Sequence, residues 1–212
     1  MIAEDNIPKI LQDIVNYLRG EKITFSRQLP DGRHNSSVNE KEIIEILKNE
    51  FNIIVPRKER AWWDFAIEDE TGFYPVNIKI TNTTRADNLN CKLGIYYALT
   101  GLIPDFPNET PWLPYFEKMK RNLGAQTDKD YYFLIFNKKN TKDVFINALK
   151  GLEKIQPNGN NLPFQCKWND NRIYVKRTVE EAEKFILSAL SESIQLRASI
   201  YDNFKHSFPN YV

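Results

Sequence analysis

Three polar side chains stand out in the stretch WWDFAIEDETGFYPVNIKIT, which covers residues 62–81: Asp64, Asn77 and Lys79. The stretch contains two β-type runs separated by the turn sequence EDETG, so we expect a hairpin that brings Asp64 beside Asn77 and Lys79. Side chains alternate between the two faces of a strand, so Asn77 and Lys79 share one face while their apolar neighbours share the other. A carboxylate, an amide oxygen and an ammonium group are therefore expected at one end of a sheet.

This combination of groups suits the hydrolysis of a phosphodiester. Mg²⁺ prefers hard oxygen ligands, usually one or two carboxylates together with water and substrate phosphate. A lysine beside such an ion can orient or help to deprotonate the attacking water, and it can stabilise charge on the phosphate. The competing interpretation is a half-exposed strand whose polar face lies in solvent. The position of Asp64, across the turn from Asn77 and Lys79, favours the first interpretation.

The elements that must position these residues follow from periodicity. Apolar residues at helical spacing predict helices over residues 7–20 and 38–51, and the second of these carries Glu40 on the same face as Ile43, Ile44 and Leu47. An acid on the buried face of a helix is unusual. The other expected elements are an apolar strand (130–138), a helix (143–155), two strands (162–169 and 172–178), a long C-terminal helix (179–205) and a segment compatible with strand or helix (88–102).

The whole chain of 212 residues fits a single domain, residues 1–212, of the α/β (α+β) class, with a central mixed β-sheet flanked by helices. It contains two cysteines and two histidines in unrelated positions, so we expect neither a zinc site nor a histidine cluster. The sequence lacks an apolar run long enough for a membrane span and lacks a secretory leader, so we expect a cytoplasmic protein with no membrane partner. A net charge of +1 does not by itself indicate nucleic acid.

The pattern Asp-x12-Asn-x-Lys formed by Asp64, Asn77 and Lys79 resembles the core motif of the PD-(D/E)xK nuclease superfamily. The most similar group is the blunt-cutting, EcoRV-like branch of the type II restriction endonucleases. Glu40 matches an acid that this superfamily often carries on the helix before the motif. The later segments IKIT and KLGIYY, and the C-terminal SIQLRASIYDNF, also resemble corresponding segments of that branch.

The resemblance implies a restriction-endonuclease-like core and a sequence-specific, Mg²⁺-dependent cleavage of double-stranded DNA. It implies that Asp64 is the main metal ligand, that Asn77 and the Ile78 carbonyl complete the protein ligands, and that Lys79 positions the nucleophilic water. Glu40 would support this site or bind a second ion. Enzymes of this kind commonly read palindromic duplexes, so a homodimer is expected.

Three segments have the composition of a DNA-facing surface. Basic residues after the second helix can meet phosphates, and Thr, Asn, Arg and Lys residues in two polar loops can contact base edges or phosphates. The predicted DNA-binding residues are Arg57, Lys58, Arg60, Thr83, Thr84, Arg85, Asn88, Lys92, Asn160 and Asn161.

One position departs from the family pattern, because Asn77 stands where Asp or Glu is usual. An amide oxygen can ligate a metal but carries no charge. A second hypothesis therefore stays open: a non-catalytic DNA-binding module with a decayed nuclease core. A third hypothesis, a small-molecule enzyme or a protein-interaction scaffold, treats the strands as ordinary core and the basic clusters as solvated surface.

Overall fold

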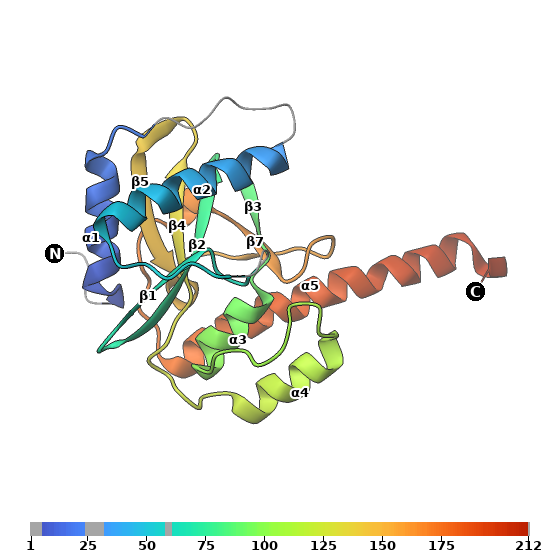
Figure 1. Ribbon diagram of the computed structural model, residues 1–212. Coiled ribbons are helices and arrows are strands. Elements are labelled where there is room, and N and C mark those ends of the chain that lie inside the picture. Colours follow the sequence, from blue (N-terminus) through green and yellow to red (C-terminus); the bar gives the residue numbers. More distant parts are fainter. Residues whose placement is uncertain (1–5, 24–31, 58–60, 212) are drawn as a thin grey trace.

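The computed structural model describes residues 6–23, 32–57 and 61–211, with the side chains of the second range described from residue 38 onward. Figure 1 shows a sheet with helices on both sides and one long helix that projects from the body. The helices are α1 (Lys9–Gly20), α2 (Gly32–Glu50), α3 (Lys92–Thr100), α4 (Trp112–Asn122) and α5 (Val179–Ser207). The strands are β1 (Phe65–Asp69), β2 (Gly72–Thr81), β3 (Ala86–Leu89), β4 (Tyr132–Asn137), β5 (Asn140–Ala148), β6 (Gln156–Pro157) and β7 (Phe164–Lys167).

The main sheet has the strand order β1-β2-β4-β5 and is mixed. β1 and β2 form the expected antiparallel hairpin, with Phe65 opposite Val76. β2 then runs parallel to β4, and β4 pairs antiparallel with β5. The parallel pair requires a long connection, which here includes β3, α3 and α4. The predicted α/β class with a central mixed sheet flanked by helices is confirmed.

The alternation along β2 and β4 divides the core into two parts. Val76, Ile78 and Ile80 of β2 pack in a cluster that also contains the buried faces of α1 and α2. Phe133 and Ile135 of β4 point to the other face, where they pack with residues of α3, α4 and α5. Asn77 and Lys79 alternate with the buried residues of β2, so their side chains leave the face that α1 and α2 cover.

A second, small sheet has the order β3-β7-β6. Leu89 of β3 and Phe164 and Cys166 of β7 are buried in the same cluster as Phe133. This packing sets the second sheet beside the main sheet, close to the end of β2 at which the polar residues emerge.

Several of the expected elements are wrong. The segment 143–155, predicted as a helix, forms the second half of β5 and a short 3-10 helix, Leu149–Gly151. Val144 and Phe145 there pair with β4, and tertiary pairing overrides a helical pattern in a short apolar run. Residues 172–178, predicted as a strand, form no strand: residues 172 and 173 lie in a bend and residues 174–178 in coil. The ambiguous segment 88–102 contains the end of β3 and all of α3.

Other expectations hold. The helix predicted over residues 7–20 is α1, the apolar run 130–138 contains β4, and the C-terminal helix is one continuous element, α5. Within the described ranges, no helix combines the length and the apolar character needed to cross a membrane.

Candidate active site beside strand β2

The site lies at the end of the hairpin where β1 begins and where β2 extends beyond its pairing with β1. The Asp64 backbone N–H donates to the Val76 carbonyl at 2.8 Å, and β1 starts one residue later at Phe65. Beyond Val76, the Asp64 carboxylate occupies the place of a neighbouring strand. Its Oδ2 accepts hydrogen bonds from the Ile78 backbone N–H at 2.6 Å and from Asn77 Nδ2 at 2.9 Å.

The same geometry presents a backbone oxygen to the site. In an antiparallel pair, the N–H and the C=O of one residue point to the same side of the strand. The Ile78 N–H faces Asp64, so the Ile78 carbonyl lies on that side as well. Lys79 Nζ reaches across to β3 and donates to the Asn88 carbonyl at 3.2 Å.

The residues predicted for the site line one cavity of about 400 Å³. Glu40 reaches it from α2, Asp64 from the residue before β1, and Asn77, Ile78 and Lys79 from β2. The structure therefore brings together all five residues that the sequence nominated for metal binding and catalysis. The other lining residues are Ile80, Thr81, Asp87, Asn90, Cys91, Tyr131, Phe133 and Lys138.

Burial makes the two acids of the cavity difficult to ionise together. Removal from water raises the pKa of Glu40 to about 7, and the negative charge of Asp64 adds to this effect while Lys79 opposes it. Burial also raises the pKa of Asp64, against the hydrogen bond from the Ile78 N–H and the charge of Lys79. A cation between the two carboxylates would relieve both effects.

The thiol in the cavity wall is not a nucleophile. Cys91 is 4% exposed, and burial raises its pKa to about 12. Cysteine reacts as the thiolate, so Cys91 acts in this wall as a small apolar residue.

The donor set fits Mg²⁺ in its chemistry. Across the described residues, no group of three or more His, Cys, Asp or Glu side chains is placed to hold a metal ion. The acidic part of this site is the pair Asp64 and Glu40, and the Ile78 carbonyl supplies a third oxygen. Mg²⁺ is often held by one or two carboxylates and keeps several waters, so these oxygens suffice for it.

Asn77 is oriented differently from a metal ligand. Its amide nitrogen, rather than its oxygen, faces Asp64 Oδ2. For Asn77 to ligate the same ion as Asp64, the amide group must turn over so that its oxygen faces the cation. In the orientation present here, the uncharged Asn77 amide donates a hydrogen bond to the Asp64 carboxylate.

Sequence reasoning did not select two charged residues of the cavity. Asp87 of β3 faces it and accepts a hydrogen bond from Trp168 Nε1 at 2.8 Å. Lys138 follows β4, and its backbone N–H donates to the Thr81 carbonyl at the end of β2 at 2.9 Å. Lys138 directly follows β4, which is parallel to β2. Because the carboxyl ends of parallel strands meet at the same edge of a sheet, this position in the sequence could have marked Lys138 as a neighbour of the polar end of β2.

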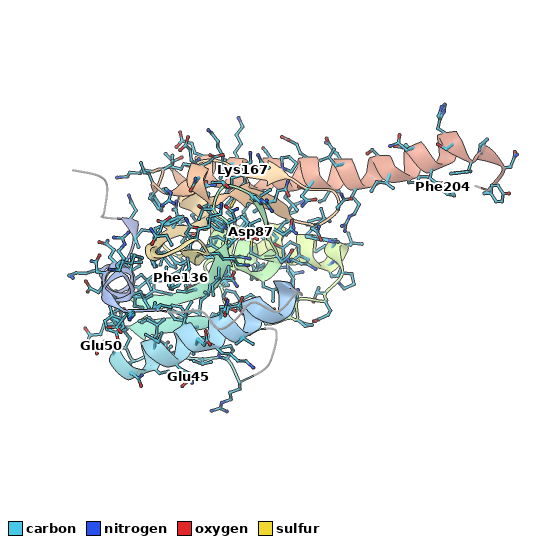
Figure 2. All side chains as sticks on the ribbon, turned by 90° about the horizontal axis from the view of Figure 1, so that it is seen from above. Glu45, Glu50, Asp87, Phe136, Lys167 and Phe204 are labelled. Carbon is cyan, nitrogen blue, oxygen red and sulfur yellow. The ribbon has the colours of Figure 1, made fainter. Side chains whose placement is uncertain are left out.

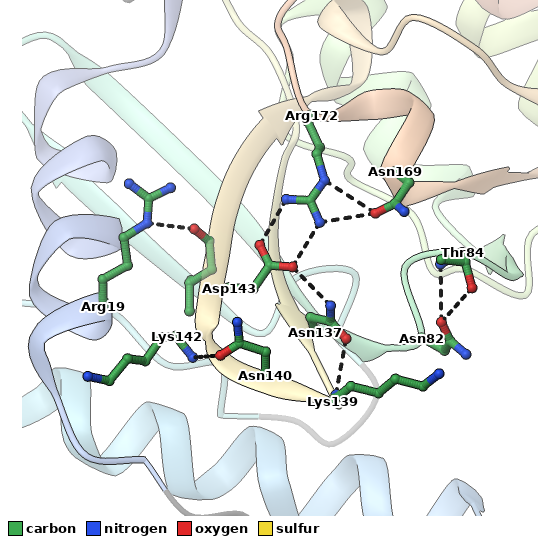
Figure 3. A network of polar contacts seen from close by, with 11 residues as sticks. Arg19, Asn82, Thr84, Asn137, Lys139, Asn140, Lys142, Asp143, Asn169 and Arg172 are labelled. Atoms are coloured by element: carbon green, nitrogen blue, oxygen red, sulfur yellow. Dashed lines mark hydrogen bonds and ion pairs between the residues drawn. The ribbon is translucent and has the colours of Figure 1, made fainter.

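Polar contacts fix the strand ends beside Lys138 (Figure 3). Arg172 makes two bonds to the Asp143 carboxylate, each 2.8 Å, and Asn137 Nδ2 donates to the same carboxylate at 2.9 Å. Asn137 Oδ1 in turn accepts the backbone N–H of Lys139 at 3.0 Å. The β4–β5 turn is therefore held in place, while Lys139 and Lys142 beside it are exposed and Lys138 lines the cavity.

A second groove lies next to the cavity and shares Asn90 with it. Its volume is about 570 Å³, and three predicted DNA-binding residues line it: Lys92, Asn160 and Asn161. Lys92 donates to the Thr110 carbonyl and lies 4.6 Å from the centre of the Trp112 ring. The structure thus brings together residues from two loops that are far apart in the sequence.

The other predicted DNA-binding residues are placed less uniformly. Thr84 and Arg85 are exposed, but Thr83 is 1% exposed, so its prediction as a direct DNA contact is not supported. Asn88 is partly buried, and its Oδ1 accepts a hydrogen bond from Asn158 at 2.9 Å. Arg57 is exposed and lies outside the cavity lining. Lys58 and Arg60 lie outside the described residues.

Comparison with models of known protein families finds no match for this chain, and a search of curated protein sequences finds none either.

Proposed function

We propose that this protein is a Mg²⁺-dependent endonuclease of the type II restriction class that hydrolyses phosphodiester bonds in double-stranded DNA. The observation that carries the proposal is the meeting of Glu40, Asp64, Ile78 and Lys79 in one cavity at the end of β2. Two partly buried acids, a backbone carbonyl and an ammonium group are parts that metal-assisted attack of water on a phosphate can use. The strand geometry behind them is rigid, since β2 lies between β1 and β4.

Each residue has a separate task in this proposal. Asp64 and the Ile78 carbonyl would hold Mg²⁺, which would supply Lewis-acid stabilisation of charge on the phosphate. Lys79, fixed by the Asn88 carbonyl, donates to a phosphate oxygen or to the attacking water. Glu40, which titrates near neutral pH, is suited to accept a proton from that water or to hold a second ion. The reaction cleaves one P–O bond, and the leaving oxygen takes up a proton.

The substrate and assembly follow from the same proposal. A restriction enzyme that reads a palindromic duplex matches the two-fold symmetry of its site with a homodimer. The groove with Lys92, Asn160 and Asn161 is next to the cavity and is the part of the described surface best placed for contacts to flanking nucleotides.

A second candidate function is a DNA-binding module with an inactive nuclease core. The hydrogen bond from the Asn77 amide to Asp64 favours this alternative, because it satisfies the carboxylate without a metal. It predicts DNA binding with no Mg²⁺-dependent cleavage.

The test is incubation of the protein with plasmid DNA in Mg²⁺ and, separately, in EDTA. The proposal expects discrete bands that disappear in EDTA and in Asp64→Asn, a variant that keeps the shape of the side chain but removes its charge. Lys79→Ala should slow single-turnover cleavage by roughly 10²–10⁴-fold. Lys120→Ala, an exposed lysine on α4, is the matched control and should cleave normally. DNA binding without cleavage selects the second candidate, and the absence of both excludes the two.

A further inference from the structure

The C-terminal half of α5 projects from the body, and no other element of the described part of the chain covers it (Figures 1 and 2). The first half of the helix packs on the core through Ala182, Ile186, Ala189 and Leu190. From residue 195 to 207 every residue is exposed, which corresponds to about 20 Å of helix. We call residues 195–207 the α5 arm. The arm continues a helix that is already formed and packed at its base, so its exposed apolar side chains, rather than its helix formation, point to a packing partner.

The arm carries an apolar stripe on the same face that the first half buries. Leu196, Ile200 and Phe204 follow one another at intervals of four residues on the arm, and Phe208, the residue just after α5, continues this spacing; each of the four is 46–54% exposed. We call these four residues the arm stripe. Positions 186, 190 and 193, which precede the stripe on this face, are buried. The apolar face of α5 is therefore continuous: the body covers it as far as Ser193, and it is exposed from Leu196 onward.

The direction of the arm is fixed by the loop between β6 and β7. The Asn158 N–H donates to Ser193 Oγ at 2.9 Å. Arg197 donates from Nε to the Gly159 carbonyl and from Nη2 to the Asn160 carbonyl, both at 2.8 Å. A Cβ at position 159 would approach Leu196 Cβ to 2.9 Å, so glycine allows this close approach. The arm is thus anchored to the body at its base.

The composition of the arm fits protein rather than nucleic acid. Its charged residues are Arg197, Asp202 and Lys205, and Arg197 is already bonded to the body. This leaves too few cations for a phosphate-binding surface, whose affinity depends on several such contacts. Apolar and aromatic side chains instead dominate the exposed face, as they do in the buried centres of protein interfaces.

The stripe is complementary to itself. Ile200 lies midway between Leu196 and Phe204, so an antiparallel second arm sets Leu196 opposite Phe204 twice, around a central pair of Ile200 residues. Ridges of residues at i±4 pack into each other with helices crossing near −50°. The four stripe side chains of each copy are about half exposed, so at about 150–250 Å² per large side chain the pair buries at most roughly 600–1,000 Å², the size of a weakly associating interface.

We propose that two copies of this chain associate through their α5 arms, antiparallel and with the two-fold axis at Ile200. This interface is isologous, since the same surface serves both copies. It stands on the geometry of α5 and holds whether or not the cavity at β2 cleaves DNA. If it does, the loop that anchors each arm is also the loop that carries Asn160 and Asn161, so dimerisation positions two copies of that loop.

The first experiment measures molar mass by light scattering and sedimentation across a range of protein concentrations. The full-length protein should be a dimer with a dissociation constant in the micromolar range or tighter. The double variant Ile200→Glu/Phe204→Glu should be a monomer with unchanged body structure by circular dichroism. The matched control is Gln195→Glu/Ala198→Glu, which adds the same two charges at exposed positions on the face of the arm opposite the stripe and should remain dimeric.

A second experiment tests the register. Both natural cysteines are buried, so an added exposed thiol reacts alone. Ile200→Cys should give a disulfide-linked dimer on mild oxidation, while Ser199→Cys should not. A monomeric wild-type protein, or equal dimerisation of the two charge variants, overturns the proposal. Cross-linking at Ser199 but not at Ile200 overturns the orientation. If the wild-type protein is a monomer and the stripe variant Ile200→Glu/Phe204→Glu loses DNA or vesicle binding, the dimer is overturned and the arm belongs to that other partner.

Discussion

At the scale of single residues, the central feature is that a side chain replaces a strand. Asp64 lies immediately before the first residue of β1, and its carboxylate takes the hydrogen bond that a neighbouring backbone would have taken from the Ile78 N–H. Buried carboxylates require such partners. The hydrogen bonds from the Ile78 N–H and from Asn77 hold the carboxylate beside β2, and the proposed function uses it there as a metal ligand.

Asn77→Asp tests the charge at this position. Without Mg²⁺, a further carboxylate beside Asp64 should lower the free energy of unfolding, because two like charges are then buried together. With Mg²⁺ the order should reverse, and an active enzyme should cleave at lower Mg²⁺ concentrations. Urea unfolding with and without Mg²⁺, together with cleavage rates over a Mg²⁺ series, measures both effects. Loss of cleavage from an active wild type would show that Asn77 serves as a hydrogen-bond donor.

Glu40 makes stability depend on pH. Its pKa in the folded protein is about 7, above its ordinary value, so the folded state binds more protons than the unfolded state between those two values. The free energy of unfolding should therefore fall as the pH rises through this window in the absence of metal. Glu40→Gln should remove this loss. The free energy of unfolding of the variant, compared with that of the wild type, should be higher at pH 8 than at pH 5 by about 2 kcal/mol, after allowance for solvent screening.

The control for Glu40 is Glu45→Gln, an exposed acid on the same helix that should leave the pH profile unchanged. If the carboxylate is needed for cleavage, the rate should rise with pH through about 7 in the wild type and lose that rise in Glu40→Gln. A profile that is the same in wild type and Glu40→Gln would remove Glu40 from the site.

At the scale of elements, the hairpin and the helix before it were readable from the sequence, and they carry the site. The period-2 pattern of β2 and the turn after β1 predicted the register that brings Asp64 to Asn77, and the helical stripe predicted that Glu40 faces inward. Local patterns sufficed because these residues are close in sequence. Asp87 and Lys138 were missed since their placement depends on how the second sheet and β4 pack, which no local period encodes.

The segment 143–155 shows the opposite case. Its apolar residues satisfied a helical pattern, yet Val144 and Phe145 pair with β4, and Arg19 of α1 donates to the Val144 carbonyl at 2.9 Å. β4 is buried on both faces and needs a partner on its free edge. The unpaired edge is a property of the sheet, so the strand structure of β5 could not be predicted from the sequence of β5 alone.

The start of α5 gives a prediction at this scale. Thr178 caps the helix: its Oγ1 accepts a hydrogen bond from the Glu181 N–H at 3.2 Å, and the Glu181 carboxylate accepts one from the Thr178 N–H at 2.8 Å. Thr178→Ala should lower the free energy of unfolding by about 1 kcal/mol, while Thr178→Ser should keep most of it. Urea denaturation of the three proteins measures the difference, and equal losses in both variants would show that methyl packing rather than capping matters at Thr178.

At the scale of the whole molecule, the fold separates stability from function. The two hydrophobic clusters lie on opposite faces of the main sheet, and the cavity opens at the sheet edge between them. Polar residues from α2, β2, β3 and the end of β4 meet there without interrupting either core. Substitutions at the cavity should therefore change charge and chemistry more than they change packing.

The surface around the cavity should dominate DNA affinity, and Lys138 tests this. Lys138 lines the cavity, where a bound backbone must pass, and its loss removes one phosphate contact. Lys138→Ala should weaken binding and reduce the slope of log K against log salt by about 0.9. Gel shifts in Ca²⁺ over a salt series give that slope. Lys9→Ala is the matched control. It removes an exposed lysine of α1, which is not part of the cavity lining, and should leave the slope unchanged. Equal slopes for the wild type and Lys138→Ala would show that DNA does not cross this edge of the sheet, and the cavity at β2 would then need a smaller phosphate ester as its substrate.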